Sequence, residues 1–251
     1  IALGGASGLT GFAAYKSQTD PVHVFWDLDH TILCSISPIP TNNSNDSPLS
    51  DLNHSDNHAQ SKCPVSPSNL AAKFLPKLPD LRHFDQVDDD FPYDAGTLAP
   101  NTRTYFRPGA QMALKLCSYF AIPHVYTAAQ ESYTNNILDE LDPDRSLFAK
   151  VIHRDDFPQI VREGKDLRVG ADNMQRAILF DDKIKNFEPQ NFENGIAVVP
   201  FTSDGVEKCN NGSWTAYLQE IKEMSRLVGI AFWSTTHFSG DVRKVVGWVR
   251  S

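Results

Sequence analysis

The stretch VHVFWDLDHTIL, residues 22–33, decides the fold of this 251-residue chain. Residues 22–26 have the β-branched and aromatic composition of a buried strand, which ends abruptly at Asp27. Asp29 follows two residues later, so both carboxylates project toward the same side if the extended conformation persists into the turn. One of them can then coordinate a hard cation and attack as a nucleophile, while the other serves as acid and base.

Two later apolar runs end in the same way. Residues 124–126 lead into Thr127, and the fully apolar residues 177–180 lead into Asp181 and Asp182. In an open parallel sheet, ligands bind beyond the carboxyl ends of the strands. A DxD or DD pair taken singly is common in turns and helix caps, but three polar strand ends together predict one site. Mg²⁺ binds one or two carboxylates, several waters and a substrate phosphate, which suits this set.

Strands and helices alternate from Thr104 onward. The pattern predicts three helices: one that begins at residues 107–109, one that runs through residues 137–141, and one over residues 214–228. It also predicts strands at residues 150–153 and 195–199. Such alternation predicts βαβ units and a mostly parallel sheet flanked by helices, an α/β fold. On helix 107–120, Met112, Ala113, Leu116, Cys117 and Phe120 recur at helical spacing.

Composition excludes several classes of protein. Hydrophobic residues make up 41% and charged residues 22%, as in a soluble globular protein, and the formal net charge is −8. This sign gives no support to direct nucleic-acid binding, which needs clustered Lys and Arg. The four cysteines are far apart and form no CxxC pair, which argues against a zinc site and for a reducing compartment.

The predicted domain organisation has four parts. Residues 1–20 begin with an apolar, small-residue segment, for which two interpretations stay open: a disordered or core-packing terminus, or the end of a membrane anchor. Residues 21–228 form the main domain, with a flexible, strongly polar insert at about 35–72, and the acidic run 85–90 is expected to be a solvated loop. Residues 229–251 form a C-terminal tail that we expect to be helical.

These motifs together resemble a known family. The residues FWDLDHTIL are similar to the nucleophile motif of the haloacid dehalogenase (HAD) superfamily. Further segments resemble, in the right order, the FCP/SCP-like branch that dephosphorylates the C-terminal tail of RNA polymerase II: residues 106–109, 125–128, 141–143, 152–155, 164–167 and 178–182. The resemblance covers roughly residues 22 to 201 and implies a HAD-like (Rossmannoid) fold without a substantial cap domain.

The resemblance also implies roles for single residues. Asp27 would be the nucleophile and a metal ligand, and Asp29 the acid and base, with its carbonyl facing the metal. Thr127 and Lys165 would hold the phosphoryl oxygens, although taken alone Thr127 would be a helix cap and Lys165 a solvated loop residue. The remaining implied residues are Asp181 and Asp182 as Mg²⁺ ligands, and Thr31, Ala128 and Arg154 as substrate-binding residues.

The implied activity is that of a Mg²⁺-dependent protein serine/threonine phosphatase with an aspartyl-phosphate intermediate, since an uncapped site favours a phosphorylated protein. Two alternatives remain. One is a binding module like the import receptor subunit of the inner mitochondrial membrane translocase, and the other is a capless small-molecule phosphatase. The expected location is intracellular, either the nucleus or a membrane of the endoplasmic reticulum, nuclear envelope or mitochondrion, and the sequence leaves the oligomeric state open.

Overall fold

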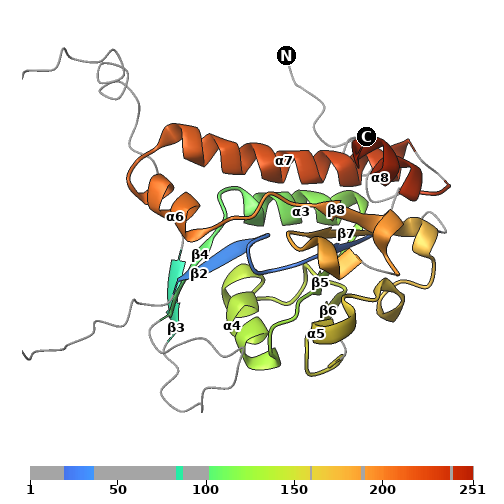
Figure 1. Ribbon diagram of the computed structural model, residues 1–251, viewed down its shortest axis with the longest axis horizontal. Coiled ribbons are helices and arrows are strands. Elements are labelled where there is room, and N and C mark those ends of the chain that lie inside the picture. The colour runs from blue at the N-terminus through green and yellow to red at the C-terminus, as the bar shows by residue number, and fades with distance from the viewer. Residues whose placement is uncertain are drawn as a thin grey trace, which may run out of the picture. The chain divides into compact units, whose positions relative to one another are not determined.

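The computed structural model describes residues 20–36, 83–86, 102–158, 160–187, 190–237 and 240–250. All of them belong to one of the two compact units of the chain, the unit made of residues 1–38 and 80–251 (Figure 1). Three predictions fall on residues outside these ranges: the nature of the first 19 residues, the polar insert beyond residue 36 and the absence of a cap.

A five-stranded parallel sheet lies at the centre of the unit. Its strand order is β6 (Lys150–Ile152), β5 (Ile122–Tyr126), β1 (His23–Trp26), β7 (Ala177–Asp181) and β8 (Gly195–Ala197). Helices pack on both faces, so the predicted α/β fold with a mostly parallel sheet is confirmed (Figure 1).

Strand β1 is central because its side chains are apolar on both faces. Val24, Phe25 and Trp26 are completely buried. Val24 and Trp26 face one core cluster and Phe25 faces another, as the twofold periodicity of a strand requires. Trp26 pairs with β5 on one side and with β7 on the other, so the residues that follow all three strands emerge at the same edge.

A second sheet was not predicted. It is antiparallel, with the order β2 (Leu33–Ile36), β4 (Thr102–Phe106) and β3 (His83–Gln86). The expectation of a solvated loop over the acidic run was therefore wrong at Asp85 and Gln86, which belong to β3. Strands β2 and β4 pair across a long stretch of sequence, which a local pattern does not reveal.

Helices cover the two faces of the parallel sheet unequally. Helices α3 (Ala110–Phe120) and α7 (Trp214–Thr236) lie together on one side, and α4 (Glu131–Leu141) and the short α5 (Ile160–Glu163) lie on the other (Figure 1). The other helices of the described residues are α6 (Ser203–Asn210), α8 (Arg243–Arg250) and four short 3-10 helices: η1 (Leu167–Val169), η2 (Met174–Arg176), η3 (Ile184–Phe187) and η4 (Phe192–Asn194). The helix predicted to end at residue 228 continues to Thr236, so the predicted domain boundary falls inside α7.

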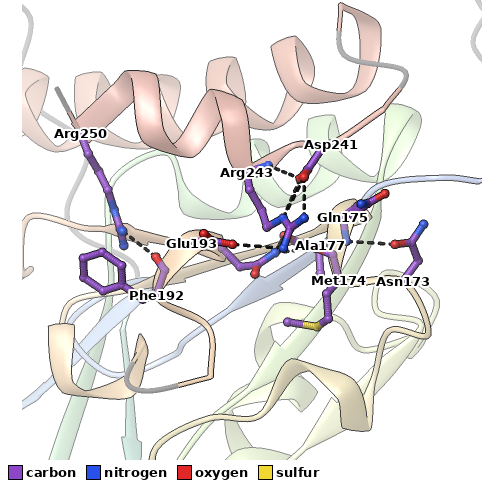
Figure 2. A network of polar contacts seen from close by, with 10 residues as sticks. Asn173, Met174, Gln175, Ala177, Phe192, Glu193, Asp241, Arg243 and Arg250 are labelled. Atoms are coloured by element: carbon purple, nitrogen blue, oxygen red, sulfur yellow. Dashed lines mark hydrogen bonds and ion pairs between the residues drawn. The ribbon is translucent and has the colours of Figure 1, made fainter.

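The C-terminal helix α8 is part of the same core. Val245 and Val246 are buried in the main apolar cluster. Arg243 binds Asp241 and reaches Glu193 at 3.1 Å, while Arg250 donates to the carbonyl of Phe192 (Figure 2). Within the described ranges no helix is long and apolar enough to cross a bilayer.

Candidate active site

The predicted site residues gather at the carboxyl edge of the parallel sheet. Asp27 follows β1, Thr127 follows β5, and Asp181 is the last residue of β7. The main-chain N–H of Asp27 still bonds the carbonyl of Phe180, at 3.0 Å, so the sheet itself fixes the position of Asp27. A cavity of about 360 Å³ opens here and is lined by Asp27, Asp29, His30, Ser35, Thr127, Ala128, Ala129, Tyr133, Arg154, Ile160, Lys183, Lys185 and Asn186.

Lys165 is the cation of the site. Its side chain is fully buried, and Nζ lies 2.5 Å from Asp27 Oδ1 and 2.6 Å from Asp181 Oδ2. Burial opposes its charge, but the two carboxylates outweigh burial and raise the pKa of the Lys165 ammonium above its usual value. Lys165 therefore stays charged and offsets part of the negative charge around Asp27.

The loop that carries Lys165 is fixed by residues that the sequence analysis missed. The Asn191 side-chain amide donates to the carbonyl of Lys165, and the N–H of Lys165 donates to the carbonyl of Asn186 at 3.3 Å. The hydroxyl of Tyr126 accepts from the N–H of Asp166 at 3.0 Å. Only the folded chain brings these residues together, and no spacing in the sequence marks them.

Asp29 points into a different set of contacts. The Tyr133 hydroxyl, on α4, donates to Asp29 Oδ1 at 2.5 Å. Ser35 Oγ lies 3.0 Å from that hydroxyl and 2.8 Å from Thr104 Oγ1, so a row of three hydroxyls leads away from the carboxylate. Burial and the neighbouring Asp29 raise the pKa of Tyr133 well above its usual value, which keeps the hydroxyl protonated and able to donate.

The donor set at the end of β7 fits a hard divalent cation. Carboxylate oxygens of Asp27, Asp181 and Asp182 all lie within 4.8 Å of one another. Within the described residues Asp182 Oδ1 is buried without a hydrogen-bond partner, and burial together with Asp181 raises the pKa of Asp182. Three carboxylates face one lysine, so a cation is needed to balance the charge. The side chain of Asp29 lies outside this group, and the contact through its carbonyl stays a prediction.

Asp181 is the most firmly held of the three carboxylates. Asn186 Nδ2 donates to both of its oxygens, at 2.9 and 2.8 Å, and the N–H of Lys183 donates to Oδ1 at 2.8 Å. These bonds leave the orientation of the carboxylate fixed before any ligand arrives.

The substrate-binding residues predicted from the motifs fall in two places. Ala128 and the half-buried Arg154 line the cavity. Thr31 is fully buried and does not line the cavity, and its contact with substrate stays a prediction. The carbonyl of Thr31 accepts a 3.1 Å hydrogen bond from the buried Arg107, which ties the loop after β1 to the start of α3.

Comparison with known proteins decides the family. The model of the NLI interacting factor-like phosphatases matches residues 22–228. The chain belongs to this family. The match begins at β1 and includes every residue assigned above to the site, and it supports phosphatase activity of the HAD type.

Solved structures agree with this family in fold. The fission yeast RNA polymerase II CTD phosphatase Fcp1, as a variant bound to beryllium fluoride, gives a TM-score of 0.54 at 17% identity, covering 96% of this chain and 72% of its own. A second structure, of the essential RNA polymerase II CTD phosphatase Fcp1, gives 0.52 at 19% identity, with coverages of 93% and 66%. No curated protein matches the chain.

Membership of the NLI interacting factor-like family confirms the resemblance to FCP-like HAD phosphatases. It does not favour the alternative of a binding module like the import receptor, because the family and both similar structures are described as phosphatases.

Proposed function

We propose that the chain is a Mg²⁺-dependent protein serine/threonine phosphatase that forms an aspartyl-phosphate on Asp27. The observation that carries the proposal is the position of Lys165, which binds Asp27 and Asp181 at once. A carboxylate approaches a phosphate dianion only when cations offset the repulsion, and this arrangement supplies one cation and the ligands for another.

Asp27 would attack the phosphorus atom, so that an oxygen–phosphorus bond forms as the bond to the leaving oxygen breaks. Asp29 would donate a proton to that oxygen and later take one from the water that attacks the phosphorus atom. This second step breaks the bond between phosphorus and Asp27 and releases inorganic phosphate. Thr127 and Lys165 would contact the phosphoryl oxygens. A Mg²⁺ ion held by Asp27, Asp181 and Asp182 would supply further positive charge for the phosphoryl group.

A protein substrate is the finer part of the proposal. It is supported by the description of the similar Fcp1 structures as phosphatases of a polypeptide tail. Serine and threonine as the phosphoresidues, and a nuclear or membrane-bound location, remain predictions from the resemblance.

The test is hydrolysis of para-nitrophenyl phosphate with and without Mg²⁺, and with beryllium fluoride as a mimic of the phosphorylated aspartate. Asp27→Asn keeps the size of the side chain and removes the nucleophile, so activity should fall at least about 10³-fold. Asp204→Asn, on the exposed face of α6, is the matched control and should retain activity. Intact-protein mass spectrometry would detect the phosphoryl adduct on the wild type alone. A folded wild type without Mg²⁺-dependent hydrolysis would refute the proposal.

A further inference from the structure

Three cationic side chains line the cavity beside two carboxylates, although the chain as a whole is acidic. The carboxylates of the cavity wall are Asp27 and Asp29, and both are used by the proposed chemistry. Its cations are Arg154, Lys183 and Lys185, which stand out on a chain with a formal net charge of −8. Cations clustered on one part of a cavity wall attract anionic ligands to that part.

Lys183 and Lys185 are held at a fixed place beside the site. The N–H of Lys183 bonds Asp181, and the N–H of Asn186 bonds the carbonyl of Lys183 at 2.9 Å. Asn186 in turn bonds Asp181 through its side chain. The short helix η3 is therefore anchored at both ends to the carboxylate that ends β7, and the backbone that carries both lysines follows the active site.

Among the described residues, two other lysines of the surface have polar partners that Lys183 and Lys185 lack. Lys208 pairs with Asp204 at 2.5 Å, and Lys150 donates to the carbonyl of Val169. Neither Lys183 nor Lys185 forms an ion pair with any carboxylate of the described residues, and both are exposed. Lys183 interacts electrostatically with Asp182, a candidate metal ligand, and Lys185 lies two residues further along the chain.

We propose that Lys183 and Lys185 form a subsite for an anionic side chain next to the phosphorylated residue of the substrate. This inference rests on the proposed function, since it names the class of peptide that the site prefers. In the proposed mechanism Lys165 and Thr127 bind the phosphate that is cleaved, so the lysines that line the cavity are available for a second anion. The ligand is a carboxylate or a second phosphate, because an ammonium group binds either one.

The experiment compares phosphoserine peptides that differ only in the neighbouring residues. One set carries Glu on the N-terminal or C-terminal side, a second carries Gln, and a third carries another phosphoserine. We expect kcat/KM of the wild type to be roughly 3- to 10-fold higher for the anionic peptides than for the Gln peptides, as suits exposed ion pairs. This ratio should shrink as salt is raised from about 50 to 500 mM.

Lysine variants locate the effect. Lys183→Gln and Lys185→Gln should each lower the ratio of anionic to neutral peptide, and the double variant should bring it close to one. Lys222→Gln, on the exposed side of α7, is the matched control and should keep the wild-type ratio. A preference for the phosphoserine set alone would still support the subsite and would define its ligand as phosphate.

A binding measurement separates this inference from the proposed function. The Asp27→Asn variant, mixed with the same fluorescent peptides, reports affinity by anisotropy without turnover. Tighter binding of anionic peptides that depends on Lys183 and Lys185 supports the subsite even if the wild type does not hydrolyse them. Equal ratios in the wild type and the double variant, by both measurements, would overturn it while leaving the phosphatase proposal intact.

Discussion

Tyr133 connects Asp29, the proposed acid–base residue, to the body of the protein. Its hydroxyl donates to Asp29 and is itself held by Ser35, which Thr104 holds in turn. These residues come from three separate elements, α4, β2 and β4. The orientation of Asp29 is thus set by a helix and by the antiparallel sheet, rather than by its own loop alone.

Replacing Tyr133 with Phe should therefore slow turnover with little effect on the fold. The variant loses one hydrogen bond to a carboxylate, an interaction worth about 1.5–3 kcal/mol, and Asp29 gains freedom to leave its position. We expect kcat for para-nitrophenyl phosphate to fall about tenfold, with a smaller change in KM. Tyr119→Phe, on the exposed face of α3, is the control. Wild-type kcat in Tyr133→Phe would show that Asp29 is positioned without this contact.

At the scale of single residues, the positions of candidate site residues were predicted correctly where they lie at the end of a strand. Asp27, Thr127 and Asp181 were predicted because each follows or ends an apolar run, and the structure brings them together. Tyr133 and Asn191 were missed, because a tyrosine on a helix and an asparagine in a loop have no distinguishing spacing. Their roles arise from contacts between segments that are far apart in sequence, such as the 104 residues between Tyr133 and Asp29.

At the scale of elements, the loop after β1 is joined to α3 and α7 by one buried ion pair. Arg107 is 2% exposed, and its guanidinium lies 2.7 Å from Glu220 Oε2 on α7. The same guanidinium donates to the carbonyl of Thr31, and its charge lies 5.8 Å from the centre of the Phe201 ring. The Arg107 side chain therefore connects the loop after β1 to the helical layer.

Removing one partner should destabilise the protein strongly, because the other charge would remain buried and unpaired. Arg107→Met should lower the free energy of unfolding by about 3–5 kcal/mol. The exposed pair between Lys208 and Asp204 is the matched contrast, and Lys208→Met should cost less than about 1 kcal/mol. Urea unfolding followed by circular dichroism measures both. Equal losses in the two variants would mean that Arg107 contributes no more than a surface charge.

The predicted elements were most accurate inside the parallel sheet. Residues 177–180 are apolar throughout and became β7, whose residues are all buried. Prediction was weaker where an element depends on distant partners, as with β2 and β4. Met112 and Leu116 share the helical spacing of the buried face of α3, yet they are 70% and 46% exposed. Periodicity identified the helix but not which of its apolar residues a neighbouring helix would cover.

At the scale of the whole molecule, a buried histidine ties stability to pH. His124 is 2% exposed and stacks on Phe25, with a ring distance of 4.6 Å. Burial lowers its pKa to about 3, and His23 and Lys150 add to the effect. Its Nε2 lies 2.9 Å from Nδ1 of His23, whose pKa burial also lowers.

Such a group is neutral in the folded protein and binds a proton on unfolding below about pH 6.5. Stability should therefore be complete above that pH and decline as the pH falls toward 3, by up to about 1.4 kcal/mol per pH unit for this histidine. Between pH 7 and pH 5 the loss from His124 alone is about 2 kcal/mol. Urea unfolding of His124→Gln should show a shallower acid decline than the wild type, while the exposed His237→Gln should not. Parallel curves for all three proteins would exclude His124 as the cause.

Metal binding should also register in global stability. The carboxylates of Asp27, Asp181 and Asp182 repel one another in the folded state, and a cation that binds there favours that state by mass action. We expect Mg²⁺ to raise the melting temperature. The free energy of unfolding should rise by about 1.4 kcal/mol for each tenfold increase in Mg²⁺ concentration above its dissociation constant. The rise in melting temperature should be smaller in Asp182→Asn. Excess chelator should reverse it in the wild type. Calorimetry that shows no shift in the wild type would count against the site.

The pairing of β2 and β3 with β4 has a consequence for which changes in sequence length the fold tolerates. Ile36 of β2 and Asp85 of β3 both lie opposite Arg103, on either side of β4, so the fold holds the ends of the intervening segment close together. When the ends of a segment already meet, doubling its length adds only about 0.6 kcal/mol of closure entropy. Insertions or deletions between β2 and β3 that leave both strands intact should therefore change the free energy of unfolding little. Homologous chains can then differ in length at this point without losing the sheet that holds Ser35 and Thr104.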